Sequence, residues 1–450
     1  MRRRGHDTTQ STNPLNILLS NGRFPVTLDL ARQLRLAGHR IFVVDTMHYH
    51  VCKFSKDVKH SYQVPVPRDD AEGYIAGVMR AVHECGIDLI IPMHEEIFYL
   101  AEAAQTNAEL RGKLLAPPFP TLIMLHNKWE FAKFLTRNGL GVPRSSLCQS
   151  YDDVLELDHN VEWALKPVYG RASTNIFHIQ PNVAPPKHED IDISEEKHYI
   201  AQEWAKGLRY CTYSVFWDGK VAALSAYPVK DTIDGASCVY FESVQNPDIT
   251  EYVDNLAAAS PGVSGQIALD LIKSDKDGKM VAIDCNPRAT SGIHLYSRTP
   301  RLASVMTCHI PVDAPRWTKP IPDHVAPPIH AKRQVAPGML MWKRASAKSD
   351  IKAIAIEYVS HMKRLVFSQD VVWSWKDLTP SLMQPFLLTS YYEICREKGL
   401  KLPTMFQHDY IWEPKGHHLE DVRRMLDKQD KKAGETFIER STIPFVSSGD

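Results

Sequence analysis

The chain has 450 residues, which is too long for one compact hydrophobic core and predicts two or three packed units. Hydrophobic residues make up 44% and charged residues 24%, as in ordinary globular proteins. Lysine plus arginine and aspartate plus glutamate both total 53, so the formal net charge is zero, which argues against a nucleic-acid partner. Every apolar run falls well short of the ~20 residues that a membrane-spanning helix needs, so we expect no membrane partner.

The first 15 residues are polar and basic, and no hydrophobic segment of the kind found in a secretory signal follows them. We therefore expect residues 1–15 to form a disordered leader. The eight cysteines are scattered along the chain without a Cys-x-x-Cys pair. Such spacing favours reduced thiols in a cytoplasmic protein over a disulfide framework or a zinc site.

Residues 16–120 alternate between apolar runs and amphipathic stretches. The apolar runs predict strands at 16–20, 40–45 and 87–92. Strand–helix alternation predicts a parallel sheet covered by helices, that is, a Rossmann-like α/β domain. Ligands of such sheets bind where strands end, and Arg23 and Glu95 follow two of these strands, although either could simply belong to a capped helix start. The single glycine after the first strand does not predict a dinucleotide site.

The pattern changes to α+β from residue 121 onwards. Residues 121–195 predict a helix that stops near Gly139, then a strand, a polar loop and a return strand. Residues 196–315 are dominated by strands, with hairpin bends at Asp218-Gly219 and Asp277-Gly278. Residues 316–450 begin with a proline-rich connector, continue with two plausible helices, and carry no chemical motif that we recognise.

The segment AIDCNPRATSG places an acid, an amide and a guanidinium at alternate positions, namely Asp284, Asn286 and Arg288. They follow the apolar residues 280–283, and alternate residues of a strand share one face, so a continuing strand would align them over roughly 13 Å. Across the predicted hairpin, Asp270 can lie opposite this row. Acid and amide oxygens suit a hard cation such as Mg²⁺, and a guanidinium suits phosphate. A solvated strand face is the ordinary alternative for any one of them.

Other residues could complete a nucleotide site. Lys166 ends a buried strand and enters a polar loop whose possible phosphate donors are Arg171, Ser173 and Thr174. Lys128 lies at the start of a helix, where it could equally be an ordinary surface lysine. The stretch from Gln202 to Ala205 could offer strand-edge backbone groups to a flat ring, or be an ordinary edge strand.

In this order of pieces, the chain resembles the ATP-grasp superfamily over roughly residues 16–310. The closing DCNPR is similar to that family's acid-x-Asn-x-Arg signature. The resemblance implies a Rossmann-like domain before a two-subdomain ATP-grasp fold. It implies ATP contacts from Lys128, Lys166, Ser173, Gln202, Glu203, Trp204 and Ala205. It also implies Mg²⁺ ligands at Asp270, Asp284 and Asn286, with Lys166 and Arg288 as the catalytic residues.

Two positions depart from the family pattern. The phosphate loop has only one glycine, Gly170, and Arg209 stands where a ribose-binding glutamate is common. Further likeness to mycosporine-glycine synthases lies in segments such as SGQIALDLI and AIDCNPRATS, whereas PMHEEIFYLAE looks more like other ATP-grasp ligases. Candidate substrate-pocket residues are Arg23, Glu95, Glu242 and His294.

The resemblance implies an ATP-dependent ligase that phosphorylates a small-molecule carboxylate and joins it to an amine or amino acid. One alternative enzyme phosphorylates an enolised ketone, 4-deoxygadusol, for attack by glycine. Another alternative is an inactive nucleotide-binding scaffold. Family members are often dimers, so a homodimer is possible.

Overall fold

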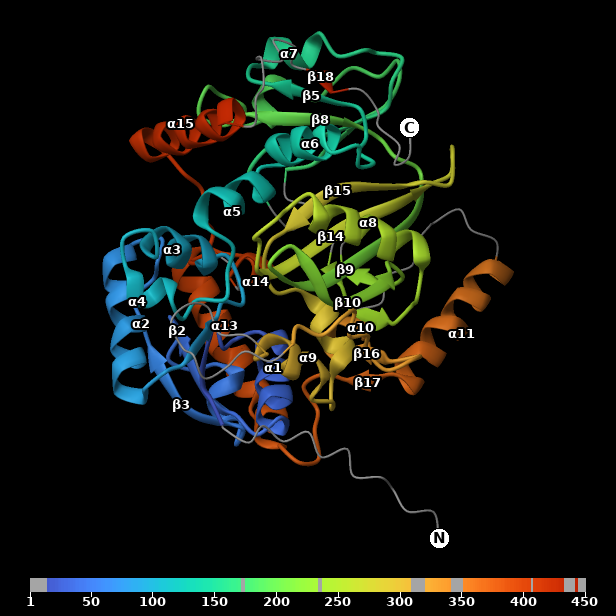
Figure 1. Cartoon of the computed structure of the whole chain (residues 1–450). Coiled ribbons are helices and arrows are strands. Elements are labelled where there is room, and N and C mark those ends of the chain that lie inside the picture. The colour runs from blue at the N-terminus through green and yellow to red at the C-terminus, as the bar shows by residue number, and fades with distance from the viewer. Residues whose placement is uncertain are drawn as a thin grey trace.

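The computed structural model describes residues 14–170, 175–233, 237–308, 320–340, 351–405, 408–432 and 442–443 (Figure 1). It opens with a parallel sheet in the order β3-β2-β1-β4. These strands are β1 (Asn16–Ser20), β2 (Arg40–Asp45), β3 (Val58–Gln63) and β4 (Leu89–Ile91). The predicted α/β start is thereby confirmed. Strand β3 was missed because VKHSYQ is a polar edge strand without a fully buried residue.

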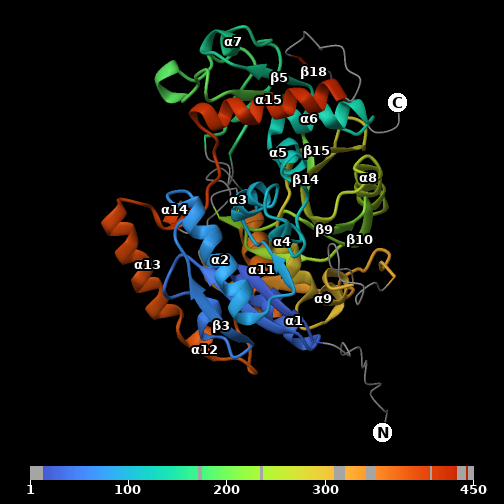
Figure 2. The ribbon, with the colours of Figure 1, turned by 60° about the vertical axis from the view of Figure 1, so that its left-hand side comes forward.

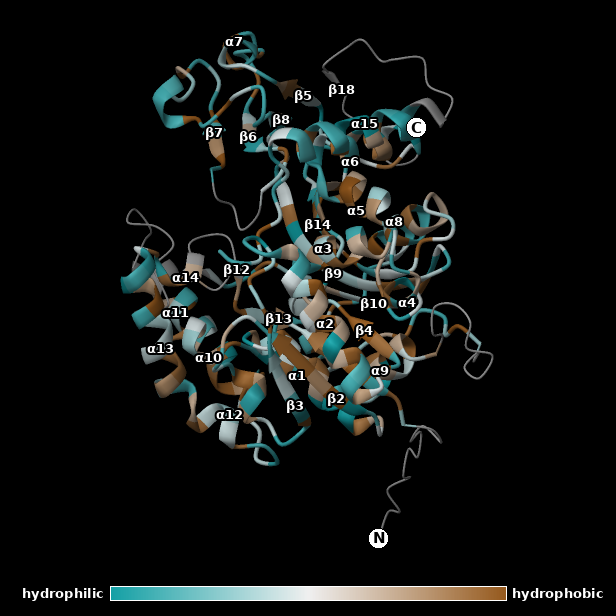
Figure 3. Ribbon diagram, turned by 90° about the vertical axis from the view of Figure 1, so that its left-hand side faces the viewer, coloured by the Kyte–Doolittle hydropathy of each residue, from teal (hydrophilic) through white to brown (hydrophobic). Residues whose placement is uncertain are grey.

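Helices cover this sheet. They are α1 (Pro25–Leu36), α2 (Ala71–Cys85), α3 (Glu96–Ala103) and α4 (Ala108–Arg111), with a 3₁₀ turn at Val51–Phe54. Asp70 caps α2 by accepting a hydrogen bond from the Gly73 N–H. Strands β1 and β4 are buried almost throughout, as expected for strands covered on both faces, and this part is largely brown in Figure 3.

The helix expected near residues 121–138 is two helices, α5 (Phe119–His126) and α6 (Lys128–Arg137). Asn127 breaks them apart, since its backbone is extended and its side chain accepts hydrogen bonds from the Trp129 and Glu130 N–H groups. A five-stranded antiparallel sheet follows in the order β18-β5-β8-β6-β7. Its strands are β5 (Ser145–Cys148), β6 (Trp163–Pro167), β7 (Phe177–Ile179), β8 (Tyr199–Glu203) and β18 (Thr442–Ile443). Helix α7 (Tyr151–Leu155) and a 3₁₀ turn at His188–Asp190 flank it.

A second antiparallel sheet has the order β10-β9-β14-β15. Its strands are β9 (Gly207–Trp217), β10 (Lys220–Pro228), β14 (Gly265–Ser274) and β15 (Met280–Asn286). Both predicted hairpin bends are confirmed: Asp218 and Gly219 have φ of 51° and 71°, and Gly278 has φ of 73°. Helix α8 (Pro247–Ala258) packs against this sheet.

Short strands and further helices lie in residues 232–370. The described strands are β11 (Thr232–Ile233), β12 (Ser237–Cys238), β13 (Tyr240–Glu242), β16 (Lys332–Gln334) and β17 (Gln369–Asp370). The helices are α9 (Arg301–Met306), α10 (Ala336–Met339) and α11 (Ile351–Phe367), with a 3₁₀ stretch at Ser291–Tyr296. Helix α11 was not predicted from the sequence.

The C-terminal helices pack back onto the rest of the chain. They are α12 (Thr379–Leu382), α13 (Gln384–Lys398), α14 (Leu402–Met405) and α15 (Gly416–Lys432). Leu387 and Tyr391 of α13 share a hydrophobic core with β1 and α1, and Tyr410 and Trp412 share another with α2 and α3. Within the ranges that the structure describes, none of the helices has the length and apolar character to cross a membrane.

Candidate active site

The acid pair predicted across the hairpin is present. Asp270 of β14 lies directly opposite Asp284 of β15, next to an irregularity in the strand register. Burial, followed by the negative charge of Asp284, raises the pKa of Asp270. Two carboxylates held together in a partly buried place therefore favour either a proton or a cation between them.

Two lysines from other elements reach the same place. The Nζ of Lys128, at the start of α6, lies 3.4 Å from Asp284 Oδ1 and donates to the Gly170 carbonyl at 2.8 Å. The Nζ of Lys166, at the end of β6, donates to the Ile283 carbonyl at 2.7 Å. Burial lowers the pKa of the Lys166 ammonium to about 8, although the Asp284 carboxylate acts in the opposite direction.

The expected straight row of polar groups is interrupted at its far end. Strand β15 stops at Asn286, so Arg288 lies beyond the strand. The Arg288 guanidinium turns back and donates to Asn286 Oδ1 at 2.8 Å through Nη2 and to the Ala289 carbonyl at 3.3 Å through Nη1. The three groups are neighbours, but they form a compact cluster and not a row.

The donor set at this place fits Mg²⁺. The carboxylates of Asp270 and Asp284 and the amide of Asn286 supply hard oxygen atoms, which this cation prefers. Over the described ranges, no group of three or more histidine, cysteine or acidic side chains is arranged to hold a metal by itself. Magnesium typically keeps only one or two protein carboxylates and takes its remaining ligands from phosphates and water. The cluster therefore suits a metal that arrives with a phosphorylated ligand.

His126 belongs to the same place and was not selected from the sequence. It ends α5, which packs against β15, and its ring lies near Phe98 and Tyr169, with centroid distances of 4.7 and 6.0 Å. Burial lowers the pKa of its imidazole to about 4. The next contributions to this pKa come from the charges of Glu95, Lys128, Asp284 and Arg288. The only sequence signal was its place directly before Asn127-Lys128.

The stretch predicted to hold a flat ring shares a sheet with Lys166, because β8 pairs with β6. The Gln202 amide is buried and donates to Ser145 Oγ at 3.2 Å. The N–H of Glu203 donates to Arg144 O, and that of Trp204 donates to Glu162 O. The Trp204 indole is 38% exposed and stacks on His178 at 3.9 Å, and Ala205 follows it.

Some predicted contacts lie outside the described residues. Ser173, together with Arg171 and Thr174, falls in the stretch 171–174, so the phosphate loop is described only as far as Gly170. Arg209 lies on β9 with an exposed side chain. Its positive charge is one of the influences that lower the pKa of Asp270, after burial and Asp284 have raised it.

Arg23 has a fully buried side chain inside an internal ion cluster. Its Nη2 lies 2.5 Å from Asp45 Oδ1, and its Nη1 lies 3.0 Å from both carboxylate oxygens of Asp409. Nη2 also donates to the Thr46 hydroxyl, and the guanidinium lies over the Tyr410 ring at 4.8 Å. This cluster occupies the donors that a substrate would need.

Two further substrate-pocket candidates also form ion pairs or hydrogen bonds with other residues of the chain. His294 is buried, with Nδ1 at 2.8 Å from Asp29 Oδ2. Glu242 lies between Lys230 and Lys332, with N–O distances of 2.6 and 3.0 Å. Neither arrangement includes a member of the Asp270–Asp284 cluster.

Glu95, the fourth candidate, is buried and accepts a hydrogen bond from the backbone N–H of Trp412 at 3.1 Å. Its charge acts on His126, and so do the charges of Asp284 and Arg288. Of the four candidates, Glu95 is the one that is connected to the acid cluster, because both act on His126.

The chain matches known proteins in its central part. Residues 125–292 match the model of the ATP-grasp domain. This match includes both lysines, the predicted ring-binding stretch, the acid pair and Arg288. The protein therefore carries an ATP-grasp domain over residues 125–292. No curated protein sequence matches the chain.

Solved structures share the fold at low sequence identity. An N5-carboxyaminoimidazole ribonucleotide synthetase in complex with ADP is 12% identical over 79% of this chain and 98% of that chain, with a TM-score of 0.53. An N5-carboxyaminoimidazole synthetase from Staphylococcus aureus, also complexed with ADP, is 11% identical over 69% and 80%, with a TM-score of 0.51. An L-amino acid ligase from Bacillus licheniformis is 17% identical over 64% and 71%, with a TM-score of 0.49.

Proposed function

We propose that this protein is an ATP- and Mg²⁺-dependent ligase that joins an amine or amino acid to a small-molecule carboxylate. The carboxylate is first phosphorylated by ATP, and the amine then displaces phosphate. The observation that carries this proposal is the meeting of Asp270, Asp284, Lys128 and Lys166 from four different elements. Two of the structures with the same fold were solved with ADP, which agrees with a nucleotide at this place.

The charges of the cluster suit a bound Mg-nucleotide. Lys128 and Lys166 would contact the phosphates, and Asp270, Asp284 and Asn286 would hold Mg²⁺, which offsets phosphate charge when bound. A magnesium ion would relieve the repulsion that raises the pKa of Asp270. Phosphate oxygens would in turn stabilise the charged form of Lys166, whose pKa burial lowers to about 8. Each unfavourable feature of the cluster thus has a matching group in the proposed ligand.

Arg288 supports the transfer itself in this proposal. Its guanidinium lies next to Asn286, where it can stabilise the oxygens of the phosphoryl group as the group moves from ATP to the carboxylate. The transfer breaks the bond to the ADP oxygen and forms an acyl-phosphate. The amine then attacks the acyl carbon, a C–N bond forms, and phosphate leaves. The adenine ring would lie against Gln202–Ala205, near the stacked Trp204 and His178.

The direct test measures ADP and phosphate release together with product mass. One substrate pool combines carboxylic acids with amino acids, and a second combines 4-deoxygadusol with glycine. We expect stimulation in the first pool, a product mass equal to acid plus amine minus water, and one ADP per product. Stimulation in the second pool alone would contradict the carboxylate acceptor. Absence of stimulated ADP release in both pools would contradict the ligase.

A further inference from the structure

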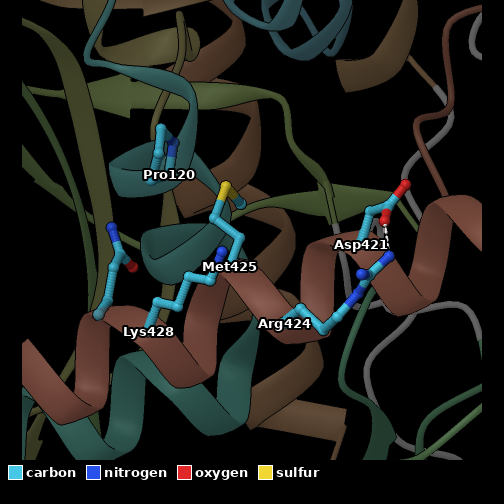
Figure 4. Close-up of a pocket in the computed structure, with 6 residues that line it drawn as sticks. Pro120, Asp421, Arg424, Met425 and Lys428 are labelled. Carbon is cyan, nitrogen blue, oxygen red and sulfur yellow. Dashed lines mark hydrogen bonds and ion pairs between the residues drawn. The ribbon is translucent and has the colours of Figure 1, made fainter.

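The C-terminal arm, residues 408–432, contacts the parallel-sheet domain at one end and helix α6 at the other. Figures 1 and 2 show its helix α15 beside α5 and α6, although more than 270 residues separate Arg137 from Asp430, which pair with each other. A groove of about 390 Å³ lies between α15 and Pro120 of α5. Figure 4 shows residues that line it, with the Asp421–Arg424 pair on α15. The sequence assigned no role to this part of the chain.

One end of the arm is fastened to the parallel-sheet domain. Asp409 pairs with Arg23, and Tyr410 lies under the same guanidinium. The Tyr99 hydroxyl donates to Ile411 O at 3.2 Å. The backbone N–H of Trp412 donates to Glu95 Oε2 at 3.1 Å. This hydrogen bond fixes the backbone of the residue that carries the indole.

The other end is fastened to the five-stranded sheet and its helix. Asp430 of α15 lies 2.7 Å from Lys133 Nζ and 2.9 Å from Arg137 Nη1, both on α6. Arg423 donates to the Glu195 carbonyl and lies 3.1 Å from His198 Nε2. Farther along the chain, β18 pairs with β5. The arm therefore connects the parallel-sheet domain with the unit that supplies Lys128 and Lys166 to the acid cluster.

Trp412 lies near the first end of the arm and contacts Tyr169, at the start of the phosphate loop. Its indole packs edge-on against Tyr169 at 5.9 Å and stacks on Phe98 at 5.0 Å. Directly before Tyr169, the Val168 carbonyl accepts a hydrogen bond from the backbone N–H of Lys128 at 3.0 Å. The carbonyl of Gly170, the residue after Tyr169, accepts a hydrogen bond from the Lys128 ammonium. A displacement of Tyr169 would therefore move the backbone that holds this lysine.

We infer that Trp412 is a positioning residue for phosphate binding, which holds Tyr169 and so fixes Gly170 and Lys128 in place. This inference rests on the proposed ATP binding. The arm thereby forms part of the nucleotide site although none of its residues belongs to the matched domain.

The test compares two nucleotides on matched variants of the full chain. Trp412→Ala removes the indole, Trp412→Phe keeps an aromatic ring, and Trp375→Ala removes a tryptophan that is 78% exposed. Calorimetry measures the Kd of MgATP and of AMP, which lacks the β- and γ-phosphates. We expect Trp412→Ala to weaken MgATP by about tenfold, consistent with the loss of one aromatic contact, and to leave AMP unchanged. Trp412→Phe and Trp375→Ala should stay close to wild type.

Hydrogen exchange on the wild-type protein provides a second readout that does not depend on whether the variants fold. We expect MgATP, but not AMP, to protect the backbone amides of residues 409–413 as well as those of residues 166 and 168–170. An equal loss of affinity for MgATP and AMP, or an arm unaffected by MgATP, would overturn the positioning role. If the wild type binds no MgATP, the proposed function itself fails; if it binds MgATP and the variants do not discriminate, only this inference fails.

Discussion

The cluster around Arg23 and the cluster around Asp284 both consist of buried charge next to a strand end, yet they are resolved in opposite ways. The Arg23 guanidinium is matched by two carboxylates, Asp45 and Asp409. At Asp284 a second acid lies directly opposite, and the Lys166 ammonium donates to a backbone carbonyl. Burial raises the pKa of Asp270 and lowers that of Lys166, so both groups resist charging. The first cluster is complete within the protein, whereas the second would be balanced electrostatically by the cation and phosphate of the proposed ligand.

The largest expected effect in this comparison is on stability. Arg23→Ala should lower the free energy of unfolding by about 3–5 kcal/mol, because it leaves two carboxylates buried without their partner. Urea denaturation measures the change, with Arg40→Ala at an exposed position as the control. A stable Arg23→Ala protein that no longer turns over substrate would instead place Arg23 in the binding site.

The next effect is on catalysis. Asp284→Asn should weaken Mg²⁺ binding and lower turnover by about 10²- to 10³-fold, since an amide lacks the charge that holds the metal and organises phosphate. The fold should survive, because the variant relieves repulsion with Asp270. ADP release and circular dichroism measure the two properties, and Asp277→Asn in the hairpin turn is the control. Normal ATP turnover by Asp284→Asn would exclude the metal assignment.

The smallest effect concerns Glu242, an acid that is matched by two lysines but partly exposed. Burial raises its pKa, but hydrogen bonds from Lys230 and Lys332 together lower it to about 2 from its ordinary value of 4.5. The charged form therefore stabilises the fold above pH 4.5, and this stabilisation is lost as the pH falls towards 2. Glu242→Gln should cost about 1 kcal/mol at pH 7 and progressively less below pH 4.5.

Unfolding curves of both proteins between pH 7 and 3 would measure that difference. A constant difference at every pH would show that Glu242 stabilises the fold by packing. If Glu242→Gln lost ATP turnover without losing stability, Glu242 would have a role in catalysis, like the acid cluster, and not a structural role like that of Arg23.

Local patterns predicted the elements that carry the acid cluster. The Asp277-Gly278 bend and the alternation along β14 and β15 predicted that Asp270 faces Asp284, because strand period and turn chemistry are local properties. The same reasoning missed β3, an edge strand with little buried surface, and the break at Asn127, whose side-chain cap overrides the helical periodicity. The row to Arg288 depended on the strand continuing, and the strand ends at Asn286.

The sequence by itself determined the alternating start, the hairpins and the residue types of the proposed metal–nucleotide site, since each depends on neighbours a few positions away. Only the tertiary structure decided which polar residues are already satisfied. Asp409 reaches Arg23 across 386 positions, and Trp412 reaches Glu95 across 317. Burial and pairing partners arise from packing between distant segments, and no local spacing encodes them. The same packing brought His126 into the cluster and joined the C-terminal arm to the phosphate loop.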